Sequence, residues 1–485
     1  MRRLSESDAA VLYADRPYAQ NLLAPIGIYD PSTAPGGSVS FDDVLRFVGG
    51  RLDVARSFRE RIVPVPFGLD RPNWAVDDDF DLEYHIRHIA LPDPGDWSQL
   101  CTQVARIVAR PLDMSRAPWE LYVIERLGGI AGTAPGAFAV LLKLHHAAVD
   151  GATGAEIFTA LHDTSPHRHT HRAAVALDDE TSTDPLSLLV RAGIRAMVRP
   201  ITALGTALPK IVRVVPGLVS EIRNGPEPSR TDLLTASPFN GQIGAHRSFG
   251  AVTVPLRTVK RIRSAVPGAT VHDVTLAVVS GALRALLDER GDLPQASMLA
   301  LTPISVHGTR GGDGDPHRPG GDVHRFRMAI ASLATHLADP LARLQVIQHC
   351  TQVARERGAI SAPSLLDIAE VLPGALMGTV QRAVLSSVNR AGRTMGFHTV
   401  IMNVPGPRVP LYFCGARATS LAGMAPVHDG MGLVHTVSSY DNEITISFTA
   451  DRDMLPDPAR YEACIAASVD ELSRTTRSPR RREVP

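Results

Sequence analysis

The chain has 485 residues, 44% hydrophobic and 21% charged, which describes an ordinary globular protein with one or two sizeable cores. Its 50 basic and 50 acidic residues balance, so composition gives no reason to expect a nucleic-acid partner. Four scattered cysteines without a CxxC pair argue against a zinc or redox site and fit a reducing compartment.

The first 110 residues alternate helical and extended patterns. The opening MRRLSESDAAVLYAD lacks the apolar region of a secretory signal and predicts a helix over Leu4–Asp15 that begins at Ser5. No run of 18 apolar residues occurs in the chain, so we expect no membrane span. The patterns that follow predict strands at Leu22–Tyr29, Arg61–Pro66 and Leu82–Ile89, and helices at Phe41–Gly49 and Ser98–Arg110.

Two adjacent histidines follow an apolar run. Phe138–Leu144 carries one charge and predicts a buried strand. His145 and His146 come next, and because side chains alternate along a strand, only one of them can enter a given cleft. A histidine at the end of a rigid strand can serve as a general base, since its pKa lies near neutrality.

A turn and a helix complete this unit. Gly151 offers the backbone freedom to turn into a helix over Ala152–Leu161, and we expect Asp150 to hold the turn more than to relay a proton. A purely structural histidine pair is the alternative to a catalytic one.

The middle of the chain differs in composition from its flanks. Three alternating histidines, His167, His169 and His171, lack acidic or cysteine partners at ligand spacing, so we expect a solvated linker and no metal. Residues Leu186–Ile222 combine apolar residues with clustered arginines, a pattern shared by an interfacial membrane helix and a packed linker. We therefore divide the chain into an N-terminal half (1–185), a basic helical linker (186–236) and a C-terminal half (237–485).

The C-terminal half again alternates strands and helices. Thr270 is a natural N-cap for a helix reaching about Leu287, and Asp273 suits the positive end of that helix. The other predicted elements are strands at Phe249–Pro255 and Met298–Ser305 and helices at Asp339–Val353 and Asp457–Leu472.

Several blocks occur in the order known from one family. HHAAVDG at His145–Gly151 resembles the HHxxxDG signature, PLDMSRAPWE resembles a PLD…RPLWE block that contains Trp119, and NVPGP at Asn403–Pro407 matches a further block. Together they resemble the bacterial wax ester synthase/diacylglycerol acyltransferase family of CoA-dependent acyltransferases. The resemblance covers nearly the whole chain outside the linkers.

The resemblance implies an α/β fold, an α+β sandwich of two chloramphenicol-acetyltransferase-like halves with a channel at their interface. It implies transfer of a long-chain acyl group from acyl-CoA to a lipid hydroxyl, of diacylglycerol or a long-chain alcohol, with His146 as general base. Acyl-CoA would be a substrate, with no cofactor, and Asn403 is a candidate oxyanion or substrate contact. We expect a cytoplasmic protein that is peripheral to the membrane or to lipid droplets.

Some positions depart from the family pattern. Pro118 changes the PLW block, His272 replaces the asparagine of an ND motif, and His307 stands where an arginine is expected, with Arg310 three residues later. If an arginine normally pairs with the motif aspartate, either Arg310 replaces it or the pairing is lost. Trp119 fits a packed core position at least as well as a recognition role. Two other functions stay open: an acyltransferase of the condensation or polyketide type that uses a carrier protein, and a catalytically impaired scaffold protein on lipid surfaces.

Overall fold

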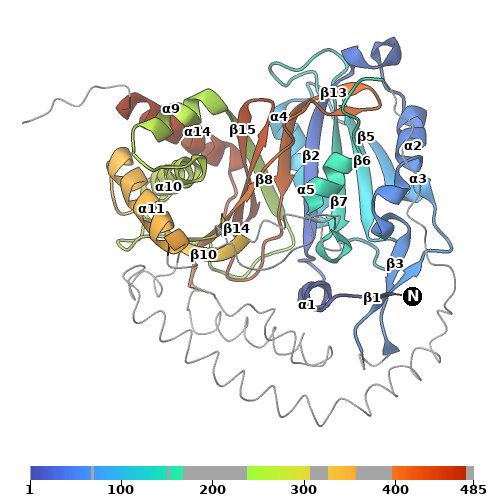
Figure 1. Cartoon of the computed structure of the whole chain (residues 1–485), viewed down its shortest axis with the longest axis horizontal. Coiled ribbons are helices and arrows are strands. Elements are labelled where there is room, and N and C mark those ends of the chain that lie inside the picture. The colour runs from blue at the N-terminus through green and yellow to red at the C-terminus, as the bar shows by residue number, and fades with distance from the viewer. Residues whose placement is uncertain are drawn as a thin grey trace, which may run out of the picture.

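The computed structural model describes residues 2–66, 70–149, 153–167, 237–305, 326–356 and 396–476. These residues form two lobes side by side, each built on a six-stranded sheet (Figure 1). The basic segment 186–222, the alternating histidines beyond His167, and Asp150, Gly151, His307 and Arg310 lie outside the described residues.

The sheet of the first lobe has the order β12-β13-β2-β7-β6-β5. Its strands are β2 (Leu22–Asp30), β5 (Ile86–Ala90), β6 (Trp119–Glu125), β7 (Phe138–His145), β12 (Tyr412–Phe413) and β13 (Ala416–Met424). The last two come from the C-terminal part of the chain, and β13 pairs antiparallel with β2. The two expected halves are therefore not separate in the sheets, because the second contributes a strand pair to the first.

Helices cover both faces of this sheet. The helices α2 (Phe41–Gly49), α3 (Leu82–His85) and α5 (Gly154–Ala160) contribute to the core on one face, and α4 (Trp97–Ala109) contributes to the core on the other. The helix α1 (Glu6–Ala14) lies at the end of the sheet, against the turn that follows β7 (Figure 1). A small sheet joins β1 (Arg2–Arg3), β4 (Asn73–Val76) and β3 (Glu60–Val63). Ser5 caps α1, as its sequence predicted. The strand expected at Leu82–Ile89 is wrong in its first half: Asp81 accepts a hydrogen bond from the Glu83 N–H and starts α3 there.

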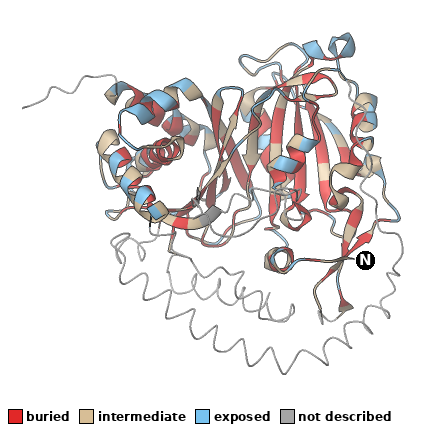
Figure 2. Ribbon diagram, in the orientation of Figure 1, coloured by how far each residue is buried: buried red, intermediate tan, exposed pale blue. Residues whose placement is uncertain are grey.

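The central strand β7 is buried along its whole length, as the apolar run predicted. Val140, Leu142 and Leu144 pack in one core cluster with α5, whereas Ala139 and Leu141 pack in another with α4. Because both faces are covered, the strand has apolar residues on both sides and not only at alternate positions. Its buried Lys143 is paired with Glu120 at 3.2 Å. Figure 2 shows the buried strands in the interior of both lobes.

The second lobe has the sheet order β10-β9-β11-β14-β15-β8. Its strands are β8 (Arg247–Pro255), β9 (Leu299–Ser305), β10 (Phe326–Ser332), β11 (Thr399–Val404), β14 (Leu433–Tyr440) and β15 (Glu443–Asp451). The helices α9 (Leu256–Ser264), α10 (Val271–Arg290), α11 (Pro340–Glu356) and α14 (Pro458–Thr475) lie on its outer side (Figure 1). The largest core cluster fills the space between this sheet and these helices.

The lobes meet through α4, which packs against β8. Phe249 of β8 and Met424 of β13 belong to the same core cluster as α4 and β2. The indole N–H of Trp97 donates a hydrogen bond of 2.7 Å to Glu462 of α14. Apolar packing and a partly buried hydrogen bond thus hold the two lobes together. None of the helices in the described part of the chain has the length and hydropathy needed to cross a bilayer.

Candidate active site

The histidine pair lies where β7 ends. His145 is the last residue of the strand and is paired in register with Leu22 of β2, while His146 begins a short 3₁₀ turn, His146–Val149. The strand is held in place by its neighbours on both sides, β2 and β6. The pair therefore stands on a rigid, buried element, as expected for groups that must be placed accurately.

Both ring nitrogens of His145 are engaged. Its Nε2 lies 2.8 Å from Asp15 Oδ2, and its Nδ1 accepts a hydrogen bond of 3.1 Å from the backbone N–H of Ala147. Because Nδ1 accepts, it carries the lone pair, and the ring proton is on Nε2, which donates to Asp15. His145 is fully buried and has no nitrogen left to take a proton from a substrate.

His146 is in a different position. Neither of its ring nitrogens makes a hydrogen bond to another described residue, and the side chain is partly exposed. Burial of the ring lowers the pKa of His146 below its usual value, and the neighbouring His145 lowers it further. A ring that is neutral near pH 7 and has a free lone pair has the properties of a general base.

Sequence reasoning missed the two residues that support this pair. Asp15 follows α1 and Asn21 precedes β2, and the carbonyl of Asn21 accepts a hydrogen bond of 2.7 Å from the His146 N–H. The sequence pattern places Asp15 only at the end of the predicted helix Leu4–Asp15. No local signal could identify it, because 130 positions separate it from His145.

Trp119 is a core residue. It is 2% exposed, and its indole N–H donates to the carbonyl of Phe58 at 3.0 Å. Its ring stacks on His85 with the centroids 4.6 Å apart. The structure thus answers the question that the sequence left open, in favour of packing.

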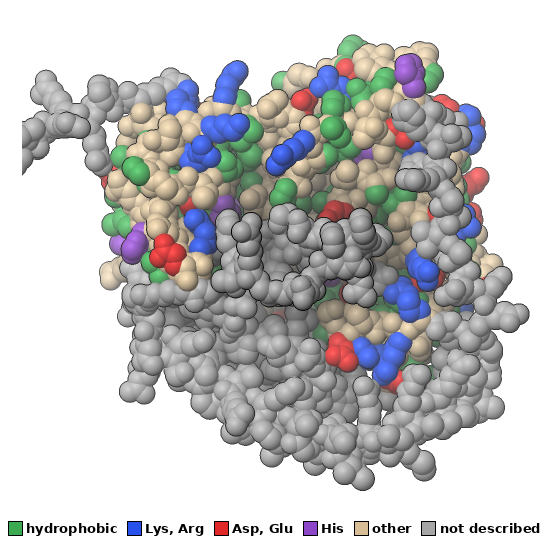
Figure 3. Space-filling model, in the orientation of Figure 1, with side chains coloured by type: hydrophobic (Ala, Val, Ile, Leu, Met, Phe, Trp, Pro, Cys, Tyr) green, Lys and Arg blue, Asp and Glu red, His purple; other side chains and the backbone are tan. Residues whose placement is uncertain are grey.

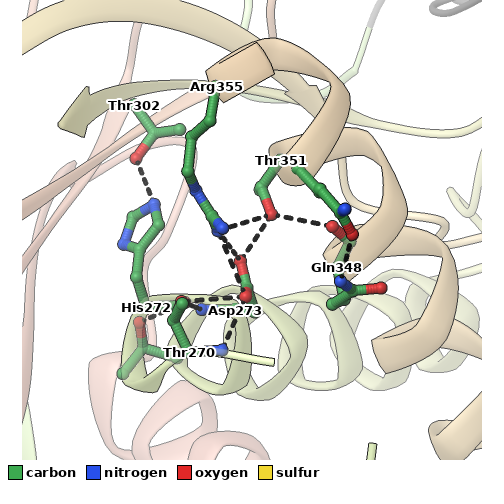
Figure 4. A network of polar contacts seen from close by, with 9 residues as sticks. Thr270, His272, Asp273, Thr302, Gln348, Thr351 and Arg355 are labelled. Atoms are coloured by element: carbon green, nitrogen blue, oxygen red, sulfur yellow. Dashed lines mark hydrogen bonds and ion pairs between the residues drawn. The ribbon is translucent and has the colours of Figure 1, made fainter. Parts of the chain in front are cut away.

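Asp273 caps α10 as predicted, and an arginine of a neighbouring helix is its partner. With Thr270 it forms a capping box, and it accepts hydrogen bonds from Thr351 and from Arg355 of α11 (Figure 4). Arg310, which the sequence offered as a replacement if an arginine pairs with the motif aspartate, lies outside the described residues. Because Asp273 is fully buried among these donors, its role is structural.

His272, next to this carboxylate, points toward β9 (Figure 4). The Thr302 hydroxyl donates to the Ile401 carbonyl at 2.8 Å, so it accepts from His272 Nε2 at 3.1 Å. Nδ1 is buried with no partner among the described residues. Burial lowers the pKa of His272 to about 4, so the ring is neutral at pH 7.

Asn403 lies on β11 in the second lobe, opposite Val437 of β14. It is partly exposed, and within the described ranges no hydrogen bond links it to the histidine pair. Its suggested contact with the oxyanion or substrate therefore stays a prediction.

A pocket lies between the lobes beside the strand pair that carries His145. Both lobes line it, with Tyr18, Leu22, Arg110, Arg247 and Thr449 among the lining residues. The hydroxyl of Thr449 is buried and has no partner in the described part of the chain. No group of three His, Cys, Asp or Glu side chains suited to a metal occurs among the described residues.

Comparison with known proteins gives the family. Residues 4–275 match the wax ester synthase/diacylglycerol acyltransferase catalytic domain, and residues 324–473 match the C-terminal domain of the same family. The O-acyltransferase WSD of Acinetobacter baylyi is 30% identical over 401 residues, which are 81% of this chain and 82% of that protein. A second relative is a Mycobacterium tuberculosis protein whose name describes it as a diacylglycerol O-acyltransferase. It is 31% identical over 426 residues, which are 87% of this chain and 88% of that protein.

Solved structures give the same fold. The wax ester synthase/diacylglycerol acyltransferase from Marinobacter aquaeolei superposes with a TM-score of 0.70 at 22% identity, covering 98% of this chain and all of that one. The first condensation domain of the calcium-dependent antibiotic synthetase superposes with a TM-score of 0.53 at 16% identity, covering 99% of this chain and 96% of that one. The two-lobed α/β arrangement expected from the sequence is confirmed, and the chain belongs to the wax ester synthase/diacylglycerol acyltransferase family.

Proposed function

We propose that this protein transfers a long-chain acyl group from acyl-CoA to the hydroxyl of a lipid acceptor, with His146 as the general base. The observation that carries the proposal is the contrast within the histidine pair: His145 has both nitrogens engaged, whereas His146 has neither bonded to another described residue. Only His146 can accept a proton without first losing an existing hydrogen bond.

The reaction moves one proton from the acceptor hydroxyl to His146 and then from His146 to the leaving thiolate. His146 takes the proton from the acceptor hydroxyl as the oxygen attacks the thioester carbonyl carbon. When the tetrahedral intermediate collapses, the carbon–sulfur bond breaks, and the CoA thiolate leaves and receives the proton from the imidazolium. No covalent enzyme intermediate is required, and holding both substrates beside the ring contributes much of the rate.

The names of the relatives support a lipid acceptor. The names of the Acinetobacter and Mycobacterium proteins describe O-acylation, the latter of diacylglycerol, and the Marinobacter structure is named for wax esters as well. We propose diacylglycerol or a long-chain alcohol as the acceptor here. A carrier-protein donor is less well supported, because the condensation domain shares the fold at 16% identity and the family match is to the lipid enzymes.

Such substrates require contact with a lipid surface. Arg257, Lys260 and Arg263 of α9 are exposed. Figure 3 shows Lys and Arg side chains gathered on the upper part of this face, the part of the molecule where Figure 1 places α9. A basic surface of this kind is attracted to anionic lipids. We propose peripheral, reversible binding to a membrane or lipid droplet, with the basic segment 186–222 as the first candidate element.

The proposal is tested with purified protein, palmitoyl-CoA and a panel of acceptors, following thiol release and ester products. Wild-type protein should form triacylglycerol or wax ester, and His146→Ala should abolish transfer without unfolding the protein. His145→Ala should reduce activity less. His88→Ala is a matched control, because His88 is a surface histidine, 38% exposed and 2.9 Å from Glu125. Equal turnover by His146→Ala and wild type would contradict the mechanism. A wild-type protein that binds lipid but does not turn over palmitoyl-CoA would favour the scaffold function.

A further inference from the structure

The carboxylate of Asp15 accepts three hydrogen bonds from the first lobe. Oδ2 accepts from His145 Nε2 at 2.8 Å, and Oδ1 accepts from both the backbone N–H and the side-chain amide of Asn21 at 2.9 Å. The Asp15 side chain is 16% exposed, so solvent competes little for these bonds. A single carboxylate thus fixes one ring of the histidine pair and the residue that precedes β2.

Asn21 carries this restraint to His146. Its carbonyl accepts the His146 backbone N–H at 2.7 Å, and its side-chain amide also donates to the carbonyl of Val11 at 3.0 Å. Asp15 is therefore connected to the His146 backbone by hydrogen bonds through one intervening residue, Asn21. A shift of Asp15 would move both histidines of the pair.

The second lobe holds the same segment from the other side. Arg16 forms an ion pair with Asp429, and Arg247 donates a hydrogen bond of 2.6 Å to the carbonyl of Tyr18. Asp429 is itself fixed, because its Oδ1 accepts from the Ile243 N–H at 3.0 Å. Residues 15–21 are thus anchored to the histidine pair at both ends and to the second lobe in the middle.

We propose that Asp15 is a positioning residue: it holds His145 as the Nε2–H tautomer and, through Asn21, sets the place of His146, while Asp429 and Arg247 fix the segment that carries it. The inference rests on the proposed function, since the position of His146 matters to turnover only if His146 is the base. Asp15 touches no reacting atom and acts through its neighbours.

The three donors around Asp15 make a specific test possible. In Asp15→Asn, one oxygen would have to replace two acceptors, so an amide N–H group must face either Asn21 or the Nε2–H of His145. If the amide N–H group faced His145, Nε2 would have to accept and the ring proton would move to Nδ1. That N–H would then oppose the backbone N–H of Ala147, which donates to Nδ1 in the wild-type protein. Asp15→Glu keeps both acceptor oxygens at the cost of a longer side chain.

We would measure kcat and KM for palmitoyl-CoA in wild type, Asp15→Asn and Asp15→Glu. The control is Asp163→Asn, which breaks the buried Arg51–Asp163 ion pair of 2.7 Å, in which neither side chain touches the histidines. Because small displacements of a catalytic group can be costly, Asp15→Asn should lower kcat about 10- to 100-fold, with KM changed by less than about twofold. Asp15→Glu should recover part of kcat, and Asp163→Asn should lower the melting temperature while kcat is kept.

A second measurement reads the tautomer in the unmodified protein. In ¹⁵N-histidine NMR spectra, the His145 signals, assigned by their loss in His145→Gln, should show a protonated Nε2 and a lone pair on Nδ1. The proposal is overturned if Asp15→Asn keeps the wild-type kcat, if Asp163→Asn loses as much kcat, or if His145 carries its proton on Nδ1. Absence of turnover in wild type contradicts the proposed function instead, and the NMR result then decides the role of Asp15 alone. If Asp15→Asn does not fold, the NMR result for the wild-type protein likewise decides the role of Asp15.

Discussion

The guanidinium of Arg355 lies 3.0 Å from Oδ1 and 3.3 Å from Oδ2 of Asp273, joining the last turn of α11 to the first turn of α10. Asp273 is fully buried, whereas the Arg355 side chain is 27% exposed. The same carboxylate accepts the Thr351 hydroxyl at 2.6 Å and caps α10 with Thr270. One side chain therefore both starts a helix and fastens it to its neighbour.

We expect Arg355→Met to destabilise the protein, because it leaves a buried carboxylate without its cation. The loss in the free energy of unfolding should be about 1–3 kcal/mol, below the value for a fully buried pair because Arg355 is partly solvated. Urea denaturation measures it. Arg417→Met removes an ion pair in which both side chains are more than 40% exposed and serves as the control. Its effect should stay below about 1 kcal/mol, and equal effects of the two substitutions would refute the prediction.

The pH dependence of turnover should reflect His146. Burial and the neighbouring His145 lower its pKa from the usual 6.5, and a general base acts in its neutral form. The value of kcat/KM should therefore be constant from neutral pH down to about 6.5 and fall only below it, approaching tenfold per pH unit. An acid limb with its midpoint above 6.5 would mean that another group, or a differently placed His146, controls the reaction.

Stability should also decrease in acid, for a separate reason. His162 is buried, donates from Nδ1 to the Phe158 carbonyl at 2.7 Å and accepts from the Tyr29 hydroxyl at 2.6 Å, and burial lowers its pKa to about 4. Between pH 6.5 and about 4 the unfolded chain binds a proton at this residue and the folded protein does not. The free energy of unfolding should be unaffected by His162 above pH 6.5 and fall across this window, by on the order of 3 kcal/mol from this residue.

Urea titrations at several pH values check this, with His162→Gln as the variant. The variant should be less stable at pH 7, since it loses well-placed hydrogen bonds, but its stability should fall less steeply with acid. Parallel curves for wild type and His162→Gln would show that His162 titrates alike in both states. His272 and His428, each with a pKa lowered to about 4 by burial, and His435, whose pKa burial lowers to about 3, would contribute to the slope that remains.

Binding to lipid surfaces should depend on clustered arginines. We expect salt-sensitive association with anionic vesicles, weakened when Arg191, Arg195 and Arg199 are replaced together by glutamate, because each basic residue near an anionic surface contributes about 1 kcal/mol. Turnover of a water-soluble acceptor should be largely kept. Co-sedimentation at low and high salt measures the association.

The α9 variant with Arg257, Lys260 and Arg263 replaced by glutamate is the companion experiment. If the α9 variant no longer sediments with vesicles and the first variant still does, the binding surface is α9. The proposal that the 186–222 segment binds the lipid surface is then wrong. If both variants sediment as fully as wild type at low salt, peripheral binding through basic residues is refuted.

Local sequence determined several of the elements and where their helices begin. The apolar run before His145 became the buried strand β7, and Ser5 and Thr270 begin helices, because a short hydroxyl side chain satisfies the free N–H groups of a first helical turn. The order of the HHxxxDG, PLD and NVPGP blocks was enough to predict the family and the two-lobed fold. These features depend on neighbouring residues or on spacing along the chain.

Only the tertiary structure decided which residues support the site. Asp15 meets His145 across 130 positions, Arg355 meets Asp273 across 82, and β13 joins the sheet of the first lobe from the C-terminal part of the chain. The packing of the lobes, and not any local periodicity, brings these groups within hydrogen-bond distance. The sequence therefore indicated the histidine pair, whereas the difference between its two members arises from contacts that exist only in the folded chain.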